Sequence, residues 1–344
     1  MNAKQRILRT LARSIPRSRA VAALFGSQGL RVACYHHIAD TEPGLIDGLG
    51  ITTSPALFAA HLDALRRDYD VVDLDTVLRG PLPKRPLLIT FDDAFRSVLD
   101  VAGPMLRERG MPAVYFLNAG CIADGRPLPE HLLNHLIHQH GITKVVEVLG
   151  LDAARCRSIG DVVATLDLDG WQQLIPRLAT GFGVDPVATA RDSGLYLTPA
   201  DVSKLAAVGI EVGNHTASHF PGRVLDAGTA RREIVDARRQ LEQWTGRPVR
   251  AYAQPFGCGS DMTPVVRAAI AEAGAEVAFL VESVANRAGA PQHGIRLFDR
   301  VGFRHEPAAE LFLHMELLPR VRAVRARMRG TRPTFDATAG SRSP

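Results

Sequence analysis

The 344-residue chain lacks the features that mark several classes of protein. No apolar run approaches the roughly 18 residues of a transmembrane helix, and the early apolar stretch 20–25 is too short for the core of a secretory signal peptide. Its four cysteines are too widely spaced for a C-x-x-C zinc motif or a disulfide framework. With 46% hydrophobic and 22% charged residues, the composition also excludes a mostly disordered chain. We therefore expect a globular protein with free thiols in a reducing, cytoplasmic compartment.

Positive charge is concentrated at the two ends of the chain, although the net charge is only +5. Residues 1–39 contain seven Lys or Arg and no acid, and residues 317–344 contain seven Arg and one acid, so the region between them is net acidic. Residues 5–15 predict a short helix that ends before Pro16, with Ile and Leu on one face and Arg on the other.

The basic ends allow more than one interpretation. A helix of this amphipathic kind is typical of membrane surfaces, which predicts a peripheral contact of residues 1–20 with the inner face of the membrane. The same helix can instead pack on its own domain, and both ends can simply be solvated. No nucleic-acid-binding module accompanies the basic residues, so we expect no nucleic-acid partner. The oligomeric state is not predicted.

Strand and helix patterns alternate along most of the chain. Apolar strands are predicted at 31–35, 71–74, 87–91, 113–117, 210–215, 249–257, 277–281 and 295–303. With helices between them, this is the βαβ pattern of a parallel sheet or barrel. Residues 126–196 interrupt the pattern with helical segments and no convincing strand, so we expect a helical insertion there.

These patterns predict an α/β protein in three parts. We expect a basic N-terminal segment at 1–30, a barrel at 31–310 that carries the insertion at about 126–196, and an Arg-rich C-terminal helix and tail at 311–344. Within the insertion, three histidines fall on one face of a predicted helix (His131, His135 and His138). We expect this face to be solvated or to face the substrate, in preference to forming a second metal site.

Two adjacent carboxylates, Asp92 and Asp93, follow directly on a wholly apolar strand. A structural aspartate at this place would normally be a single helix N-cap. Two carboxylates so close together repel each other, and their pKa values split unless a cation lies between them. The pair is therefore a candidate for metal binding or acid–base chemistry, particularly because reactive groups of α/β barrels collect where strands end.

Two histidines, His215 and His219, follow a later strand. If this segment is helical, residues four apart share one face, and imidazole is a common zinc ligand. Such a spacing alone is weak, because many pairs of this kind lie on surfaces. Together with one aspartate, however, the two histidines make a three-ligand site with open positions for water, as in catalytic metal sites. The other aspartate could then take a proton from the metal-bound water.

A third segment, YAQPFG at 252–257, follows the next predicted strand. Pro255 and Gly257 favour a tight loop whose backbone N–H groups can point into a site. An ordinary turn is the alternative interpretation.

In this order, the three segments resemble the motifs of the polysaccharide deacetylase, or NodB-homology, family (carbohydrate esterase family 4). ITFDDAF is similar to the first motif, NHTASH to the second, and YAQPFG to the shortened third motif of the branch that reads Y-P-F-G. The resemblance spans roughly residues 31–303, apart from the insertion. It implies a distorted (β/α)7 barrel and removal of an N-acetyl group from an amino sugar in a glycan or glycan precursor, with release of acetate.

The resemblance also implies a role for each motif residue. Asp92 would be the general base, and Asp93, His215 and His219 would hold a divalent metal, usually zinc. The metal and the backbone N–H of Phe256, in the loop with Pro255 and Gly257, would stabilise the oxyanion. The partner would thus be an N-acetylated carbohydrate, and a cytoplasmic location favours a lipid-linked or nucleotide-linked precursor.

The sequence departs from the family pattern at two places. The third motif usually begins with an Arg that steadies the base, and Ala253 stands there in this chain. Arg300, in a late predicted strand, could replace it. The later motif that supplies a general acid in many relatives is not found, and His36, at the end of the first strand, is the candidate in its place. A packed or capping histidine is the alternative interpretation of His36.

Two other functions remain open from the sequence. The same site could serve a deformylase or a hydrolase of a non-sugar amide, because the walls of the pocket decide the substrate. Alternatively, the chain could be a non-catalytic carbohydrate-binding relative. The presence of all four motif residues that would carry the chemistry argues against this last alternative.

Overall fold

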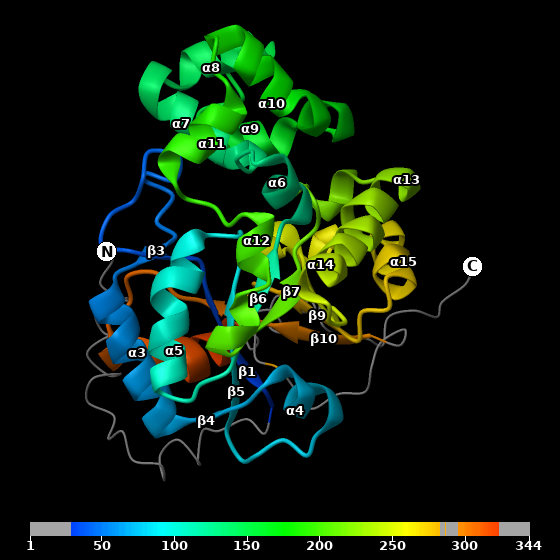
Figure 1. Ribbon diagram of the computed structural model, residues 1–344. Helices are drawn as coiled ribbons and strands as arrows, with labels where there is room; N and C mark the ends of the chain where they lie inside the picture. Colours follow the sequence, from blue (N-terminus) through cyan, green and yellow to red (C-terminus); the bar gives the residue numbers. More distant parts are fainter. Residues whose placement is uncertain (1–28, 283–285, 287–294, 323–344) are drawn as a thin grey trace.

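The computed structural model describes residues 29–282, 286 and 295–322. The predicted helix at 5–15 and most of the Arg-rich C-terminal segment lie outside these residues. Within them, a parallel β-sheet occupies the centre and helices cover its outside (Figure 1). None of the helices in the described ranges combines the length and the apolar character needed to cross a membrane.

The central sheet has the strand order β10-β9-β8-β7-β6-β5-β1-β11, and β4 also pairs with β5. Its strands are β1 (Arg31–Tyr35), β4 (Asp70–Val71), β5 (Pro86–Phe91), β6 (Ala113–Leu117), β7 (Ile210–Asn214), β8 (Ala251–Ala253), β9 (Val277–Leu280), β10 (Arg296–Asp299) and β11 (Val301–Gly302). All of these pairings are parallel. A separate two-stranded sheet pairs β2 (His37–Ile38) with β3 (Thr52–Thr53).

A single late segment connects the two ends of the sheet. β10 pairs with β9, whereas β11 pairs with β1, and only Arg300 separates β10 from β11. The segment 296–302 therefore leaves one end of the sheet and joins the other, so the sheet is nearly closed. If this segment is taken as one strand and β4, which pairs with β5 beside the main path, is left out, seven strands remain, as in the distorted (β/α)7 barrel that the sequence resemblance implies.

Helices cover the outside of the barrel and explain the burial of its strands. The longer ones are α3 (Pro55–Asp68), α14 (Ala237–Thr245) and α15 (Pro264–Glu272), with shorter segments α4 (Leu74–Arg79), α5 (Gly103–Glu108), α6 (Ala119–Asp124), α12 (Pro199–Val202) and α13 (Ala227–Ala230). π-Helical turns occur at Val98–Ala102, Arg231–Asp236 and Leu313–Leu317. β1, β5 and β6 are buried at every residue, as expected for strands covered on both faces.

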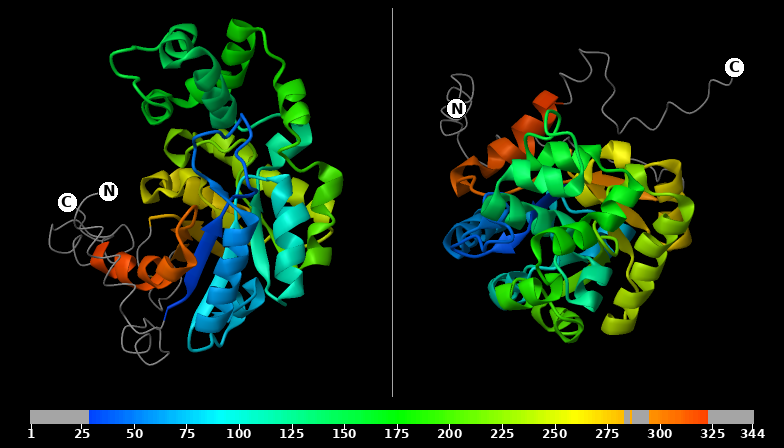
Figure 2. Two further views of the ribbon diagram at one scale, coloured as in Figure 1. Left: turned by 90° about the vertical axis from the view of Figure 1, so that its left-hand side faces the viewer. Right: turned by 90° about the horizontal axis from the view of Figure 1, so that it is seen from above.

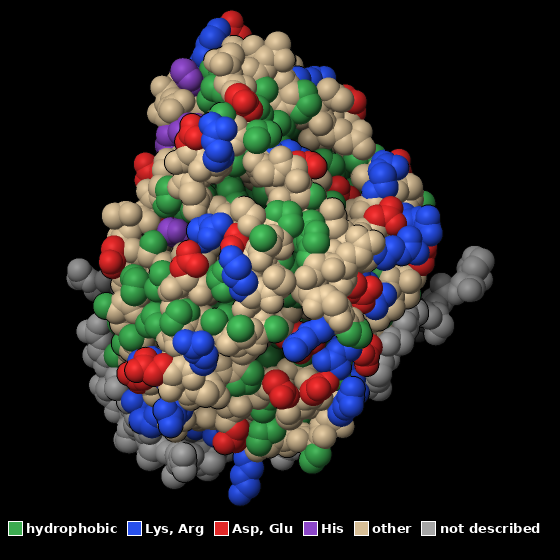
Figure 3. All heavy atoms as spheres, in the orientation of Figure 1, with side chains coloured by type: hydrophobic (Ala, Val, Ile, Leu, Met, Phe, Trp, Pro, Cys, Tyr) green, Lys and Arg blue, Asp and Glu red, His purple; other side chains and the backbone are tan. Residues whose placement is uncertain are grey.

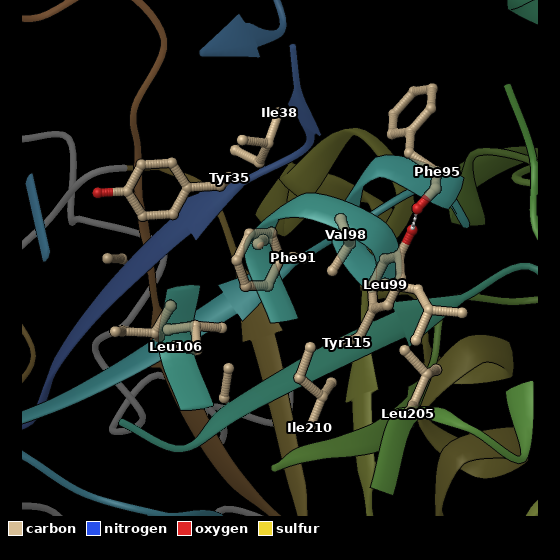
Figure 4. Close-up of a cluster of buried hydrophobic side chains, with 14 of the residues drawn as sticks. Tyr35, Ile38, Phe91, Phe95, Val98, Leu99, Leu106, Tyr115, Leu205 and Ile210 are labelled. Carbon is tan, nitrogen blue, oxygen red and sulfur yellow. Dashed lines mark hydrogen bonds between the residues drawn. The ribbon is translucent and has the colours of Figure 1, made fainter. Parts of the chain in front are cut away.

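Packing on the sheet is illustrated by α3 and the aromatic core beside it. The Ser54 side chain caps α3 by accepting a hydrogen bond from the backbone N–H of Leu57. The buried face of α3 carries Phe58, whose ring lies 5.1 Å from that of Tyr35 on β1. Deeper in the same cluster, the hydroxyl of Tyr115 donates a 2.8 Å hydrogen bond to the carbonyl of Phe95 (Figure 4). This buried polar group is thus satisfied.

The strand predicted at 71–74 is shorter than expected. β4 contains only Asp70–Val71, and α4 already begins at Leu74. The reason is a helix cap, because the side chain of Asp73 accepts a 2.8 Å hydrogen bond from the backbone N–H of Thr76. Leu74 is therefore buried from a helix and not from a strand.

Five helices form the segment 126–196 and stand above one end of the barrel (Figures 1 and 2). They are α7 (Pro129–His140), α8 (Ile142–Leu149), α9 (Ile159–Thr165), α10 (Leu168–Phe182) and α11 (Pro186–Ser193). Their apolar residues, among them Leu132 and Trp171, belong to one buried cluster with barrel residues such as Phe220 and Ile234. The segment therefore packs directly on the barrel.

The expectation for the histidine-bearing face of α7 is wrong at His131. This residue is buried, its ring stacks 5.6 Å from that of Phe95, and its Nδ1 lies 2.7 Å from the hydroxyl of Tyr196. His135 lies 3.2 Å from the carbonyl of Gly44. Much of this face thus packs against barrel loops, because the insertion folds down on them.

Charge is mixed on the face of the molecule that Figure 3 shows. Lys and Arg side chains lie between Asp and Glu side chains on the face shown in Figure 3. This agrees with the sequence, in which the excess of positive charge is confined to the two ends.

Candidate metal centre and catalytic residues

All of the candidate residues lie at one rim of the barrel. His36 follows β1, Asp92 and Asp93 follow β5, and His215 follows β7. The 255–257 loop follows β8, and Arg300 follows β10. Because the strands are parallel, their carboxyl ends meet at the same edge, where α/β barrels place their reactive groups.

Three donor atoms converge at this rim. Oδ1 of Asp93 lies 3.5 Å from Nε2 of His215 and 3.5 Å from Nε2 of His219. All three side chains are buried, and one ligand atom from each lies within 4.8 Å of the others. Oδ1 of Asp93 is buried without a hydrogen-bond partner, which would be costly in a dry site. A carboxylate oxygen and two imidazole nitrogens around one point fit a divalent cation such as zinc.

Contacts on the far side of each ring orient the two histidines. Nδ1 of His215 donates a 2.8 Å hydrogen bond to the carbonyl of Ala253, since a carbonyl can only accept. Nδ1 of His219 makes an ion-pair contact with Oε1 of Glu130. Both contacts leave Nε2 to face Asp93, and such outer partners typically fix metal-ligating histidines.

A helix would place His215 and His219 on one face, but the segment that carries these two histidines is not helical. It is a turn with positive φ at Thr216 (68°) and His219 (61°). The hydroxyl of Thr216 accepts a 3.0 Å hydrogen bond from the backbone N–H of His219, and Oδ1 of Asn214 accepts one of 3.0 Å from Thr216. The rings converge because these bonds close the turn.

Backbone strain is concentrated at this rim. In the described part of the chain, five residues other than glycine have positive φ, namely Asp93, Ala94, Thr216, His219 and Phe256. Each belongs to one of the three motif loops. Such conformations cost about 1–3 kcal/mol each and persist where the surrounding structure enforces them, as at functional sites.

Asp92 is held by Arg300. Nη1 and Nη2 of Arg300 donate hydrogen bonds of 2.7 and 2.8 Å to the two carboxylate oxygens of Asp92. Burial alone would raise the pKa of Asp92. The guanidinium of Arg300 and the nearby His215 together lower it by more than burial raises it, so the pKa of Asp92 lies below the ordinary value. Asp92 is therefore ionised at neutral pH. The thiol of Cys34 also lies 3.5 Å from Oδ2 of Asp92.

Arg300 is itself fixed on several sides. Its side chain is fully buried, and its guanidinium carbon lies 5.2 Å from the centre of the Phe116 ring. The Phe116 ring packs so closely over Gly213 that a Cβ added there would lie 2.4 Å from it. Gly213 thus allows the close packing that supports Arg300.

His36 reaches the same site from β1. Its Nε2 lies 3.8 Å from Oδ2 of Asp93, and its side chain keeps 22% of its surface exposed. Burial lowers the pKa of His36 below its ordinary value, against the opposing effect of the two carboxylates. The structure therefore places a neutral imidazole with some solvent access beside the aspartate pair.

The third motif closes another side of the site. The ring of Phe256 lies 4.7 Å from that of His219 and 5.8 Å from that of Trp171. Gly257 has φ of +67°, and a Cβ there would lie 2.7 Å from the backbone nitrogen of Val281. Only glycine fits this position without a shift of the backbone. The preceding Pro255 is buried in the same loop.

Glu130 is the site residue that the sequence analysis missed. It lies in the first turn of α7, is only 7% exposed and contacts His219. The sequence shows only an acidic residue near the start of a helix whose first turns are otherwise mostly apolar. Such a residue is usually a carboxylate that interacts with the N-terminus of its own helix. Only the packing of the insertion on the barrel reveals its partner.

Comparisons with known proteins agree with this architecture. A family model described as polysaccharide deacetylase matches residues 79–278. The Streptococcus pyogenes deacetylase PplD in complex with acetate is similar with a TM-score of 0.56 at 15% identity, over 84% of this chain and 99% of that chain. A polysaccharide deacetylase from Bacillus cereus gives 0.54 at 17% identity, over 83% and 68%.

IcaB from Ammonifex degensii gives a TM-score of 0.50 at 21% identity, over 80% of this chain and 92% of that chain. No curated protein matches the chain. At these identities the structural likenesses show a shared fold.

Proposed function

We propose a function from the premise that this chain belongs to the polysaccharide deacetylase family. The chain is a metal-dependent hydrolase that removes an N-acetyl group from an amino sugar in a glycan or glycan precursor. The observation that carries this proposal is the buried convergence of Asp93, His215 and His219 beside an ionised Asp92. A site of three protein ligands with room for water is typical of catalytic metal centres.

Asp93, His215 and His219 are proposed to hold the metal through Oδ1 and the two Nε2 atoms, with zinc the expected ion. When bound there, a divalent metal lowers the pKa of a water molecule and polarises a carbonyl oxygen. Asp92 is proposed to accept the proton that the attacking water loses, because it adjoins Asp93 and is kept ionised by Arg300. Arg300 thus takes the part of the Arg that the third motif lacks at Ala253.

The reaction breaks the amide C–N bond and forms a C–O bond between the acetyl carbon and the water oxygen. The leaving nitrogen needs a proton, and His36 is proposed to relay to it the proton that Asp92 takes from the attacking water, because its partly exposed imidazole lies beside the aspartate pair. The backbone N–H of Phe256, in the loop shaped by Pro255 and Gly257, is proposed to stabilise the oxyanion. The products are acetate and a free amine.

Acetate release and metal content together test this function. We expect wild type to release acetate from one or more members of a panel of N-acetylated sugars, glycans and lipid-linked precursors. Asp92→Asn should retain the metal but lose acetate release by about 10²–10⁴-fold. Asp100→Asn makes the same chemical change at an exposed aspartate, and this control should behave as wild type.

Other outcomes would redirect the proposal. Metal binding without acetate release on any member of the panel would contradict the acetyl substrate and favour a formyl or non-sugar amide. Equal acetate release by wild type and Asp92→Asn would contradict the role of Asp92 as base.

A further inference from the structure

We propose that Glu130, from the helical insertion, is a positioning residue of the metal site that holds His219 with its Nε2 toward the metal. The inference rests on the proposed function, because it takes Asp93, His215 and His219 as the metal ligands. It extends that function by making the insertion a part of the metal centre.

Glu130 and Asp93 lie at the two different ring nitrogens of His219. Oε1 of Glu130 makes an ion-pair contact with Nδ1 of His219, and Nε2 of the same ring lies 3.5 Å from Oδ1 of Asp93. Both side chains are more than nine-tenths buried. A carboxylate on one ring nitrogen fixes the tautomer and strengthens the other nitrogen as a ligand.

Glu130 is held firmly in this place by the start of α7. The next residue, His131, is buried in a cluster with the rings of Phe95 and Tyr196, and its Nδ1 lies 2.7 Å from the hydroxyl of Tyr196. One turn further, Asn134 donates a 3.0 Å hydrogen bond to the carbonyl of Asp47. These contacts fix α7 on the barrel rim, so the Glu130 carboxylate approaches His219 from a rigid element.

The charges of the buried site also support a role for Glu130 at the proposed metal centre. Asp92, Asp93 and Glu130 bring three carboxylates into a buried cluster in which Arg300 supplies one positive charge. The three carboxylates exceed this one guanidinium by two negative charges, which one divalent cation would compensate. Buried charges persist only when they are compensated, so Glu130 belongs to the charge balance of the occupied site.

The contacts that orient His215 and His219 are therefore of different kinds. His215 donates from Nδ1 to a backbone carbonyl, whereas His219 contacts a carboxylate. A side-chain partner can be removed by substitution, which makes His219 the ligand whose support can be tested.

The test measures zinc affinity of the full chain by competition with a chelator, for wild type, Glu130→Gln and Glu147→Gln. We expect Glu130→Gln to weaken zinc binding by about 10-fold or more. Glu147 is an exposed glutamate on α8 in the same insertion, so Glu147→Gln makes the same charge change and should bind zinc as wild type does. The visible absorption spectrum of the cobalt-loaded proteins should change for Glu130→Gln alone, because the ligand field changes.

Zinc binding by Glu130→Gln within about twofold of wild type, with an identical cobalt spectrum, would overturn the proposal. If Glu130→Gln does not fold, nitrogen NMR of zinc-loaded wild type decides the question. The proposal requires the proton of His219 on Nδ1 and the zinc on Nε2, and the reverse arrangement would overturn it. Failure of wild type to bind zinc would overturn the proposed function together with this inference, whereas the results above concern Glu130 alone.

Discussion

Arg300 donates two hydrogen bonds to Asp92 from the point where β10 gives way to β11. The strand pairings on either side of Arg300 lie at opposite ends of the sheet. The same backbone segment that nearly closes the barrel therefore also delivers the guanidinium to the aspartate beside the proposed metal ligands. This relationship links the fold to the proposed chemistry, because Arg300 both orients the Asp92 carboxylate and lowers its pKa.

Replacement of Arg300 should separate base positioning from metal binding. We expect Arg300→Met to lower kcat by about 100-fold, because Asp92 loses both donors, while the metal content stays that of wild type. The free energy of unfolding should also fall by about 3–5 kcal/mol, because a buried carboxylate loses its partner. Steady-state kinetics, elemental analysis and urea unfolding measure the three quantities.

Arg304→Met is the matched control, because Arg304 lies shortly after Arg300 in the sequence but is exposed. It should change neither kcat nor metal content. Loss of metal from Arg300→Met, or an unchanged kcat, would refute the positioning role of Arg300.

The third-motif loop should be sensitive to a single added methyl group. Gly257→Ala places a Cβ 2.7 Å from the backbone nitrogen of Val281 in addition to the strain of positive φ. We expect it to lower the free energy of unfolding by about 2–3 kcal/mol and to reduce activity, because Phe256 shifts. Gly246→Ala has the same kind of φ with open space around it, and should cost only about 1 kcal/mol with activity intact. Equal effects of the two substitutions on unfolding would contradict the close packing at Gly257.

His36 can be tested as the proton donor. We expect His36→Gln to lower kcat by about 100-fold with metal content unchanged, because the leaving nitrogen loses its acid. His135→Gln, a partly exposed histidine of α7 away from the aspartate pair, serves as the control and should behave as wild type. An unchanged kcat for His36→Gln would support the alternative of a packed histidine.

Stability should depend on pH through Asp201, in the short helix α12. Its carboxylate accepts a 3.0 Å hydrogen bond from the backbone N–H of Thr198 and pairs with Arg96 and Lys204. Burial alone would raise the pKa of Asp201. The hydrogen bonds from Lys204 and Thr198 together lower it by more than burial raises it, so the pKa of Asp201 lies below the ordinary value. The unfolded chain therefore binds this proton more readily, and the stabilisation is present above about pH 4 and lost as the pH falls below that.

Urea unfolding of wild type and Asp201→Asn at pH 7, 5 and 3 measures this effect. We expect the substitution to lower the free energy of unfolding by about 1–2 kcal/mol at pH 7, with a smaller difference at pH 3. Asp192→Asn, at an exposed aspartate, should show little effect at any pH. A difference for Asp201→Asn that does not change with pH would contradict this assignment.

Local sequence signals were sufficient for much of the architecture. The apolar runs of β1, β5 and β6 and the carboxylates that follow β5 can be found without long-range information, because strand burial and strand ends leave a direct pattern. The fold class follows from their alternation with helices, and the insertion from the loss of that alternation. The division of the chain at 31–310 and 311–344 stays a prediction.

The features that could not be predicted depend on contacts distant in the sequence. Nothing near Arg300 indicates that β11 pairs with β1, and nothing near Glu130 indicates that the insertion folds down onto His219. His215 and His219 lie in a turn and not in a helix. The reason is that the Thr216 hydroxyl and the Asn214 side chain accept hydrogen bonds from backbone N–H groups of this segment. Strained conformations of this kind arise from the whole site and have no local signature.

The most direct test of the account measures bound metal and acetate release in the same preparations of wild type and Asp93→Ala. We expect about one metal ion per chain in wild type, as for a site of three protein ligands, and loss of both metal and acetate release in Asp93→Ala. Wild type that binds no metal even after zinc is added back would contradict the central claim, as would an Asp93→Ala protein that retains metal and activity.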